Sequence, residues 1–186
     1  MAQTTHLAFP ELHTERLILR QVSESDVAEI FFLRSDERQL KYLDKKPATS
    51  FDEALTWIRL IADLQEKEEG YMWAICIKND PKLIGTFCFW NIQKEHFRAE
   101  IGYSLHPDFQ GKGIMHESMK AALDFGFKQL KFHSVEANVN PANEKSIALL
   151  QRNNFVKEAH FKENYYFNGN FIDSAIYSLL ASVHLK

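Results

Sequence analysis

A short segment with two glycines, residues 110–115, has the composition of a loop that binds anions. Its sequence is Q-G-K-G-I-M, and apolar residues follow at close to helical spacing as far as residue 127. The first amides of a helix lack intrahelical acceptors and lie at the positive end of its dipole, and glycines let such a backbone approach a ligand. The segment therefore suits a phosphate group, beside which Lys112 adds a positive charge. The alternative is that Gly111 and Gly113 only shape a tight loop.

Two common phosphate-binding motifs do not account for this segment. The P-loop pattern G-x-x-x-x-G-K-[ST] occurs nowhere in the sequence. The dinucleotide-binding fingerprint requires a third small residue where His116 stands, and it should follow an early strand of a β-α-β unit. Spacing therefore excludes both motifs.

The loop resembles the Q/R-x-x-G-x-G/A loop of the GCN5-related N-acetyltransferases, the GNAT superfamily. In that family, consecutive backbone amides hold the pyrophosphate of acetyl-coenzyme A (acetyl-CoA). The last loop position, usually Gly or Ala, is Met115 in this chain. The segments T-E-R-L-I-L-R, E-I-G-Y-S-L-H-P and N-P-A-N-E-K-S, the last followed by N-N-F, are similar to the branch of RimJ/RimL-type ribosomal-protein N-acetyltransferases. These segments span most of the chain in the expected order.

The resemblance implies that acetyl-CoA is the cosubstrate. It also implies that free backbone N–H groups at the end of the strand 99–105 donate to the oxyanion that develops during acyl transfer. The residues that we expect at acetyl-CoA are Tyr103, Ser104, Leu105, Gln110, Gly111, Lys112, Gly113, Ile114, Met115, Asn138, Asn143 and Ser146.

The thiolate that leaves during acyl transfer benefits from a proton or a hydrogen bond. Many GNAT enzymes supply it from a Tyr, but Leu150 occupies that position here. The RimJ/RimL-type branch resembles a scheme in which the Ser of N-x-x-S, Ser146, takes this role, with Asn143 on the same helix face. Ordinary polarity at the start of a helix is the alternative explanation of Asn143 and Ser146.

Glu100 is the candidate base, which would draw a proton from the acceptor amine through water. It lies on the polar side of the strand 99–105, where a solvent-facing glutamate without a role fits the sequence nearly as well. An α-amine has a reference pKa about 2.5 units below that of Lys, so its deprotonation is easier by roughly 3.4 kcal/mol. A weak or water-relayed base is therefore sufficient for a protein N-terminus, whereas a lysine side chain demands more of the site.

Periodicity and turn chemistry predict the elements that position these residues. Helices are predicted after Ser23, from Ser50 as far as Gly70, after Gly113 and after Pro141. The predicted strands cover residues 14–20, 73–77, 83–90, 99–105, 134–139, 155–167 and 171–180.

This order of elements predicts an α+β fold. We expect one acetyltransferase domain, residues 1–186, with a mostly antiparallel sheet of about seven strands flanked by helices. The resemblance further implies that the strands 99–105 and 134–138 splay apart and that the pantetheine arm of acetyl-CoA lies in the gap.

Composition excludes several classes of protein. The formal net charge of -3 argues against a direct nucleic-acid partner. Residues 1–10 lack a signal-peptide pattern and no apolar run is long enough to span a membrane, so we expect a cytoplasmic protein without a membrane partner. Cys76 and Cys88 lie in apolar runs and are expected to be buried free thiols. The histidines show no metal-ligand spacing with cysteine, so no metal is expected.

The sequence thus favours an N-acetyltransferase that acts on a primary amine, foremost the N-terminal α-amine of a protein such as a ribosomal protein. Two alternatives stay open: acetylation of a small amine (a polyamine, amino acid or aminoglycoside) and a non-catalytic acyl-CoA-binding module. Trp90, Tyr165 and Tyr166 either line an acceptor groove or only pack. An exposed aromatic hairpin could pair with a second copy, which leaves a homodimer open.

Overall fold

The chain folds around one eight-stranded sheet. The computed structural model describes residues 9–186; residues 1–8, part of the stretch predicted to lack a signal peptide, lie outside the described residues. The strand order is β1-β2-β3-β4-β5-β6-β8-β7, and all neighbours are antiparallel except β5 and β6. The strands are β1 Leu12–His13, β2 Leu17–Gln21, β3 Tyr71–Ile77, β4 Leu83–Gln93, β5 Arg98–Leu105, β6 Ser134–Val139, β7 Val156–Phe167 and β8 Asn170–Leu180. The predicted α+β class is confirmed, and the strand beyond the predicted seven is the two-residue β1.

Six α-helices and three short 3-10 helices accompany the sheet in the described part of the chain. The predicted N-cap is confirmed at Ser50, whose Oγ atom accepts from the N–H of Glu53 at 3.2 Å. The helix predicted after Pro141 is α5, and Asn143 is its N-cap. The four-residue α2 was not predicted because it is too short to show helical periodicity. The helices are η1 Glu24–Asp26, α1 Val27–Ser35, α2 Glu37–Leu40, α3 Phe51–Glu66, η2 Lys94–His96, η3 Pro107–Phe109, α4 Ile114–Lys128, α5 Glu144–Arg152 and α6 Ala181–His184.

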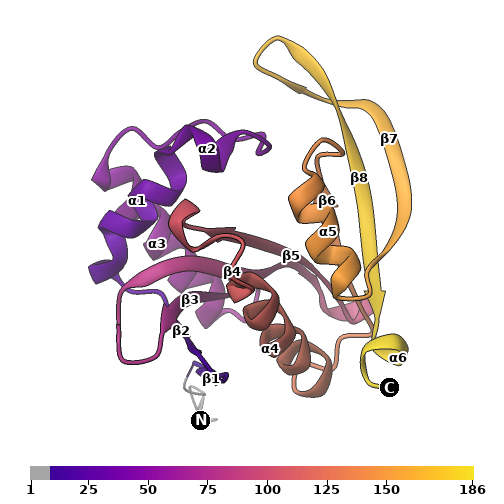
Figure 1. Cartoon of the computed structure of the whole chain (residues 1–186), viewed down its shortest axis with the longest axis horizontal. Helices are drawn as coiled ribbons and strands as arrows, with labels where there is room; N and C mark the ends of the chain where they lie inside the picture. Colours follow the sequence, from indigo (N-terminus) through magenta and orange to yellow (C-terminus); the bar gives the residue numbers. More distant parts are fainter. Residues whose placement is uncertain (1–8) are drawn as a thin grey trace, which may run out of the picture.

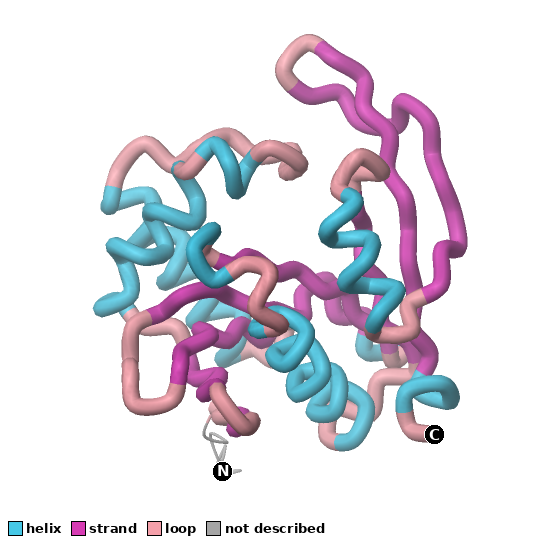
Figure 2. The backbone as a smooth tube through the Cα atoms, viewed as in Figure 1, coloured by secondary structure: helices cyan, strands magenta, loops and turns pink. Residues whose placement is uncertain are grey.

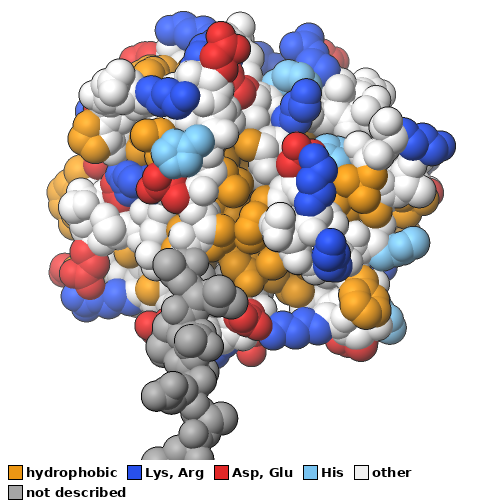
Figure 3. Space-filling view, turned by 90° about the horizontal axis from the view of Figure 1, so that it is seen from below, with side chains coloured by type: hydrophobic (Ala, Val, Ile, Leu, Met, Phe, Trp, Pro, Cys, Tyr) orange, Lys and Arg blue, Asp and Glu red, His pale blue; other side chains and the backbone are white. Residues whose placement is uncertain are grey.

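The sheet separates two hydrophobic cores (Figure 1). Alternate residues of β3 show the division: Trp73 and Ile75 join the core that includes α4 and α5, whereas Met72, Ala74 and Cys76 join the core beneath α1 and α3. Hydrophobic side chains also reach the surface along the middle of the face in Figure 3, which is seen from below. Helices on both faces therefore hold the central strands in place.

Helix α3 ends four residues before the predicted stop at Gly70. Its last residue is Glu66, and Glu68 adopts the left-handed conformation that usually ends a helix at glycine, with φ of 55°. The N–H of Glu69 then donates to the carbonyl of Leu64 at 2.8 Å, which satisfies an acceptor in the last turn. The prediction was wrong because a non-glycine residue closes the helix.

The last hairpin extends beyond the other elements. Strands β7 and β8 turn at Asn168 and Gly169, both with positive φ, as the Asn-Gly pair predicted. Figures 1 and 2 show the two strands projecting past the helices at the top of the view. The aromatic side chains of this hairpin include Tyr165 and Tyr166, which are 42% and 67% exposed. The edge strand β7 is thus largely open to solvent.

Strands β5 and β6 diverge after a short parallel contact. They pair only at Arg98 with Ser134, Ala99 with Val135, and Glu100 with Glu136. Residues 101–105 have no register partner in β6, although residues 137–139 continue to pair with β8. The predicted splaying of the central strands is therefore confirmed.

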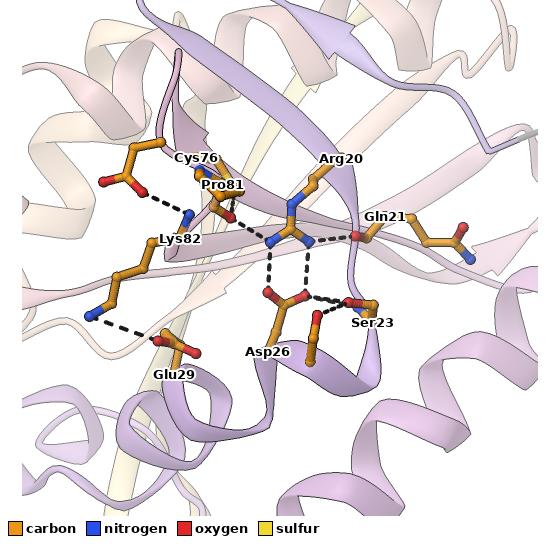
Figure 4. A network of polar contacts seen from close by, with 10 residues as sticks. Arg20, Gln21, Ser23, Asp26, Glu29, Cys76, Pro81 and Lys82 are labelled. Carbon is orange, nitrogen blue, oxygen red and sulfur yellow. Dashed lines mark hydrogen bonds and ion pairs between the residues drawn. The ribbon is translucent and has the colours of Figure 1, made fainter.

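A buried ion pair fastens the start of α1 to β2 (Figure 4). Nη2 and Nη1 of Arg20 lie 2.6 and 2.9 Å from the two carboxylate oxygens of Asp26, and the N–H of Ser23 donates to the same carboxylate at 2.9 Å. The guanidinium also donates to the carbonyls of Gln21 and Pro81. The hollow of about 630 Å³ beside this pair is lined by residues other than the predicted site residues. The pair therefore has a structural role.

Neutralising this carboxylate should destabilise the fold. Burial alone would raise the pKa of Asp26, but the hydrogen bonds from Arg20 and Ser23 outweigh burial and lower the pKa. Asp26→Asn leaves Arg20 partly buried without its anion, so we expect the free energy of unfolding at pH 7 to fall by about 3 kcal/mol. Chemical denaturation measures this loss, and Asp63→Asn on an exposed face of α3 is the matched control.

The effect of Asp26→Asn should depend on pH. Since the folded-state pKa is lowered, the pair stabilises the protein above the unfolded pKa of about 3.9 and ceases to do so as the pH falls through the folded pKa. The difference between wild type and variant should therefore shrink on acidification. Coincident unfolding curves at pH 7 would contradict the structural role.

Candidate active site

The loop before α4 presents a row of backbone N–H groups that have no acceptor. Gly111 and Gly113 both adopt φ of 75°, in the region that favours glycine. Within residues 9–186, the N–H groups of residues 111–116 have no hydrogen-bond acceptor, and the helical ladder begins where the N–H of Glu117 donates to the carbonyl of Gly113 at 3.0 Å. Unpaired N–H groups at the start of a helix bind anions well. The geometry thus matches the phosphate site that the sequence predicts.

The side chains of this loop leave the N–H row uncovered. Ile114 and Met115 are 5% and 8% exposed and pack into the core with α4. The large residue at the position that is usually Gly or Ala therefore lies beneath the loop. Lys112 is exposed, with its Nζ atom 5.5 Å from the ring centre of Phe109. Its charge is free to face an anion.

Two glutamines hold the end of β5. Gln110 donates from its side chain to the carbonyl of Leu105 at 3.0 Å, and its backbone N–H is already bonded to Pro107. Gln39 of α2 donates to the same Leu105 carbonyl at 2.8 Å and accepts from the hydroxyl of Ser104 at 2.9 Å. Gln110 thus ties the loop to β5 and offers no free backbone donor. Gln39 was not predicted, because it lies on the short helix that the sequence did not reveal.

A carboxylate on α4 fixes the loop from its other side. Glu117 accepts from the hydroxyl of Thr14 at 2.5 Å, and from the backbone N–H and Nε of Arg16 at 3.0 and 2.7 Å. Arg16 also donates to the carbonyl of Lys112 at 3.1 Å. Burial would raise the pKa of Glu117, but these bonds outweigh burial and lower the pKa. The segment T-E-R-L-I-L-R was singled out in the sequence, but this support role was not predicted.

Backbone groups of β5 face the side from which β6 has diverged. The N–H of His106 donates to the carbonyl of Ile84 on β4 at 2.8 Å. Alternate residues of an antiparallel ladder point their N–H groups in opposite directions, so those of Tyr103 and Leu105 point away from β4. These two N–H groups are the donors predicted for the oxyanion.

The predicted residue Ser146, whose backbone N–H is bonded to Asn143, meets Tyr103 across this gap. The hydroxyl oxygens of Ser146 and Tyr103 are 2.6 Å apart, and the N–H of Ser146 donates to Oδ1 of Asn143 at 3.1 Å. Oδ1 of Asn143 therefore caps α5, while its amide nitrogen has no partner among residues 9–186. Leu150, aligned with the Tyr of many GNAT enzymes, is fully buried in the core. The sequence predicted the backbone of Tyr103 at this site and missed its side chain.

Glu100 lies at the last paired position before the strands diverge. Burial and the neighbouring charge of Glu136 raise the pKa of Glu100 to about 7, against opposing effects of Asn91 and Lys45. Glu136 itself is paired with Arg98. A carboxyl group with a pKa near neutral is suited to accept a proton at physiological pH. Glu136 was not predicted, because its register with Glu100 depends on the parallel contact.

Asn138, which the sequence places at acetyl-CoA, contacts the last hairpin. Asn138 is exposed on β6 and donates to the hydroxyl of Tyr165 at 3.3 Å. Cys76 and Cys88 are both free thiols, as predicted; Cys76 is buried, whereas Cys88 is only partly buried. Across residues 9–186, no cluster of three or more His, Cys, Asp or Glu side chains could hold a metal ion. Of the helices described, none has the length and apolar character needed to cross a membrane.

Comparison with known proteins identifies the family. A family model described as an acetyltransferase (GNAT) domain matches residues 16–156. N-acetyltransferase p20 of Bacillus licheniformis is 36% identical over 169 residues, which is 91% of this chain and 95% of that protein.

Two solved structures share the fold. Spermidine N-acetyltransferase from Vibrio cholerae, in complex with CoA and spermine, has a TM-score of 0.83 at 26% identity, covering 93% of this chain and all of that one. RimL, a ribosomal L7/L12 alpha-N-protein acetyltransferase in complex with coenzyme A, has a TM-score of 0.83 at 26% identity, covering 92% and 98%. The chain therefore belongs to the GNAT family and is an N-acetyltransferase.

Proposed function

We propose that this enzyme, acting as one domain, transfers the acetyl group of acetyl-CoA to the N-terminal α-amine of a protein, such as a ribosomal protein. The observation that carries the proposal is that the N–H groups of residues 111–116, which find no acceptor in the described part of the chain, lie beside the diverging strands β5 and β6. These N–H groups and the charge of Lys112 would bind the pyrophosphate. The pantetheine arm would then extend between the strands toward Tyr103 and Ser146.

The choice of acceptor rests on charge. One similar structure is a ribosomal L7/L12 alpha-N-protein acetyltransferase and another is a spermidine N-acetyltransferase. Family membership alone therefore does not decide between a protein α-amine and a polyamine as the acceptor. Glu136 forms an ion pair with Arg98, whereas Glu100 forms no ion pair among residues 9–186, although Lys45 lies near enough to oppose the rise of its pKa. A single carboxylate suits an acceptor with one reacting amine better than a polyamine with several positive charges. This favours the α-amine.

The groups that we propose for catalysis lie on opposite faces of the sheet. Alternation along β5 puts Glu100 on one face and Tyr103, with Ser146, on the other. Glu100 would take the proton of the amine, directly or through water, as the nitrogen attacks the thioester carbonyl. The N–H groups of Tyr103 and Leu105 would stabilise the oxyanion. When the C–S bond breaks, the electron pair stays on sulfur, which Ser146 stabilises by a hydrogen bond.

The acceptor class is tested by comparing three substrates. We expect transfer to a peptide with a free α-amine, and little transfer to the same peptide with a blocked N-terminus and an internal Lys, or to spermidine. Isothermal titration with acetyl-CoA checks cofactor binding in parallel. Transfer to spermidine alone would support the small-amine alternative. Tight binding without turnover on any amine would support a non-catalytic module, and no binding at all would reject the proposal.

Removing the Ser146 hydroxyl should slow the reaction without weakening cofactor binding. For Ser146→Ala we expect kcat to fall by roughly tenfold, as expected when one hydrogen bond to a charged group is lost. The dissociation constant of acetyl-CoA should stay nearly unchanged, because the pyrophosphate contacts remain. Ser25→Ala, which removes a hydroxyl 2.7 Å from that of Ser23 on the short helix before α1, is the matched control. Equal turnover of Ser146→Ala and wild type would remove Ser146 from the mechanism.

The dependence of kcat/KM on pH should reveal the protonation of Glu100. Below about pH 7 both Glu100 and the α-amine are protonated, so log kcat/KM of the wild type should fall with a slope of two. Glu100→Gln should leave a slope of one and lower kcat/KM by roughly 10²-fold at pH 8.

Glu136→Gln provides the matched control for this profile. It removes the like charge that helps to raise the pKa of Glu100, so the break in the wild-type profile should move to lower pH while activity persists. A wild-type profile that Glu100→Gln leaves unchanged would show that another group is the base.

A further inference from the structure

Two hydroxyl groups meet where the leaving sulfur would lie. Tyr103 on β5 and Ser146 on α5 are 43 residues apart, yet their oxygens are 2.6 Å from each other. The Tyr103 ring is held in place, since it stacks on Phe87 with ring centres 6.4 Å apart and an interplanar angle of 8°. The contact thus joins a rigid aromatic side chain to the first turn of α5.

The direction of this hydrogen bond decides which of the two hydroxyl protons is left for a ligand. Burial raises the pKa of Tyr103 to about 12, so the phenol keeps its proton throughout the working pH range. Either hydroxyl could donate in this contact, but only one assignment leaves the Ser146 proton available to a third atom. If Tyr103 donates, Ser146 can still donate to a ligand. If Ser146 donates, its single proton is used.

We propose that Tyr103 is a positioning residue that donates to the oxygen of Ser146 and thereby directs the Ser146 proton at the sulfur of the thioester. This inference rests on the proposed function and deepens it. Two anchors would then fix Ser146: the phenol on its oxygen and Asn143 on its backbone N–H. In the transfer step, the C–S bond breaks, sulfur keeps the electron pair, and Ser146 stabilises the thiolate, which later takes a proton from water.

This arrangement compensates for the absent tyrosine at Leu150. The side chain of Leu150 cannot donate a proton or a hydrogen bond, and it is fully buried in the core. The phenol of Tyr103 is carried by β5, whereas the tyrosine of many GNAT enzymes would be on α5. Tyr103 would therefore act on the sulfur indirectly, through its hydrogen bond to Ser146. A direct role, in which Tyr103 itself contacts sulfur, predicts a different pattern of mutant rates.

A double-mutant cycle with Tyr103→Phe and Ser146→Ala separates these possibilities. We expect Tyr103→Phe to lower kcat by about fivefold in the wild-type background and to have no further effect in Ser146→Ala. The acceptor KM and the acetyl-CoA dissociation constant should stay within about twofold, since the phenol would act only in the chemical step. Tyr177→Phe, at another buried tyrosine in the core, is the matched control and should leave kcat unchanged.

Each other outcome is decisive. If Tyr103→Phe costs the same factor in both backgrounds, Tyr103 does not act through Ser146 and the inference fails while the proposed function stands. If Tyr103→Phe has no effect on kcat, the inference fails as well. A loss of kcat that tracks a lowered melting temperature would show a merely structural role. If the wild type acetylates no amine, the proposed function fails and the inference fails with it.

Discussion

The unpaired N–H groups of residues 111–116 are the constraint on which the rest of the site depends. Backbone donors are normally bonded within a fold, so a row without acceptors requires water or a ligand. The row exists because Gly111 and Gly113 adopt left-handed conformations immediately before α4. It keeps its orientation because Glu117 and Arg16 fix the loop to the turn just before β2. A loop that suits a diphosphate is thereby built from main-chain atoms and held by side chains behind it.

The second constraint is the early end of the parallel contact between β5 and β6. Pairing between the two strands stops at Glu100 and Glu136, and among the described residues the later β5 donors that point away from β4 have no strand to bond. The two faces of the sheet differ in chemistry at this gap. On one face burial and a like charge raise the pKa of Glu100 to about 7, and on the other Tyr103 meets Ser146. A thioester in the gap would thus have a base and a hydrogen-bond donor on opposite sides.

Local sequence predicted the parts of the site that depend on local geometry. The glycines before α4, the cap of α3, the start of α5 after Pro141 and the alternation of β5 follow from short spacings, and each was confirmed. Contacts between distant residues were not predicted: the Tyr103–Ser146 bond, the Arg16–Glu117 clamp and the Gln39 contacts join segments 43 to 101 residues apart. No periodicity encodes such pairings. The end of α3 was missed for a different reason, because a glutamate there adopts a conformation that usually indicates glycine.

Amide hydrogen exchange followed by NMR tests the diphosphate site most directly. Without ligand, the N–H groups of residues 111–116 should exchange rapidly, while that of Glu117 is protected by its bond to Gly113. Saturation with coenzyme A should protect the N–H groups of the loop and leave that of Glu117 little changed. If coenzyme A binds and the exchange of residues 111–116 stays as fast as before, these amides do not hold the diphosphate and the account is contradicted.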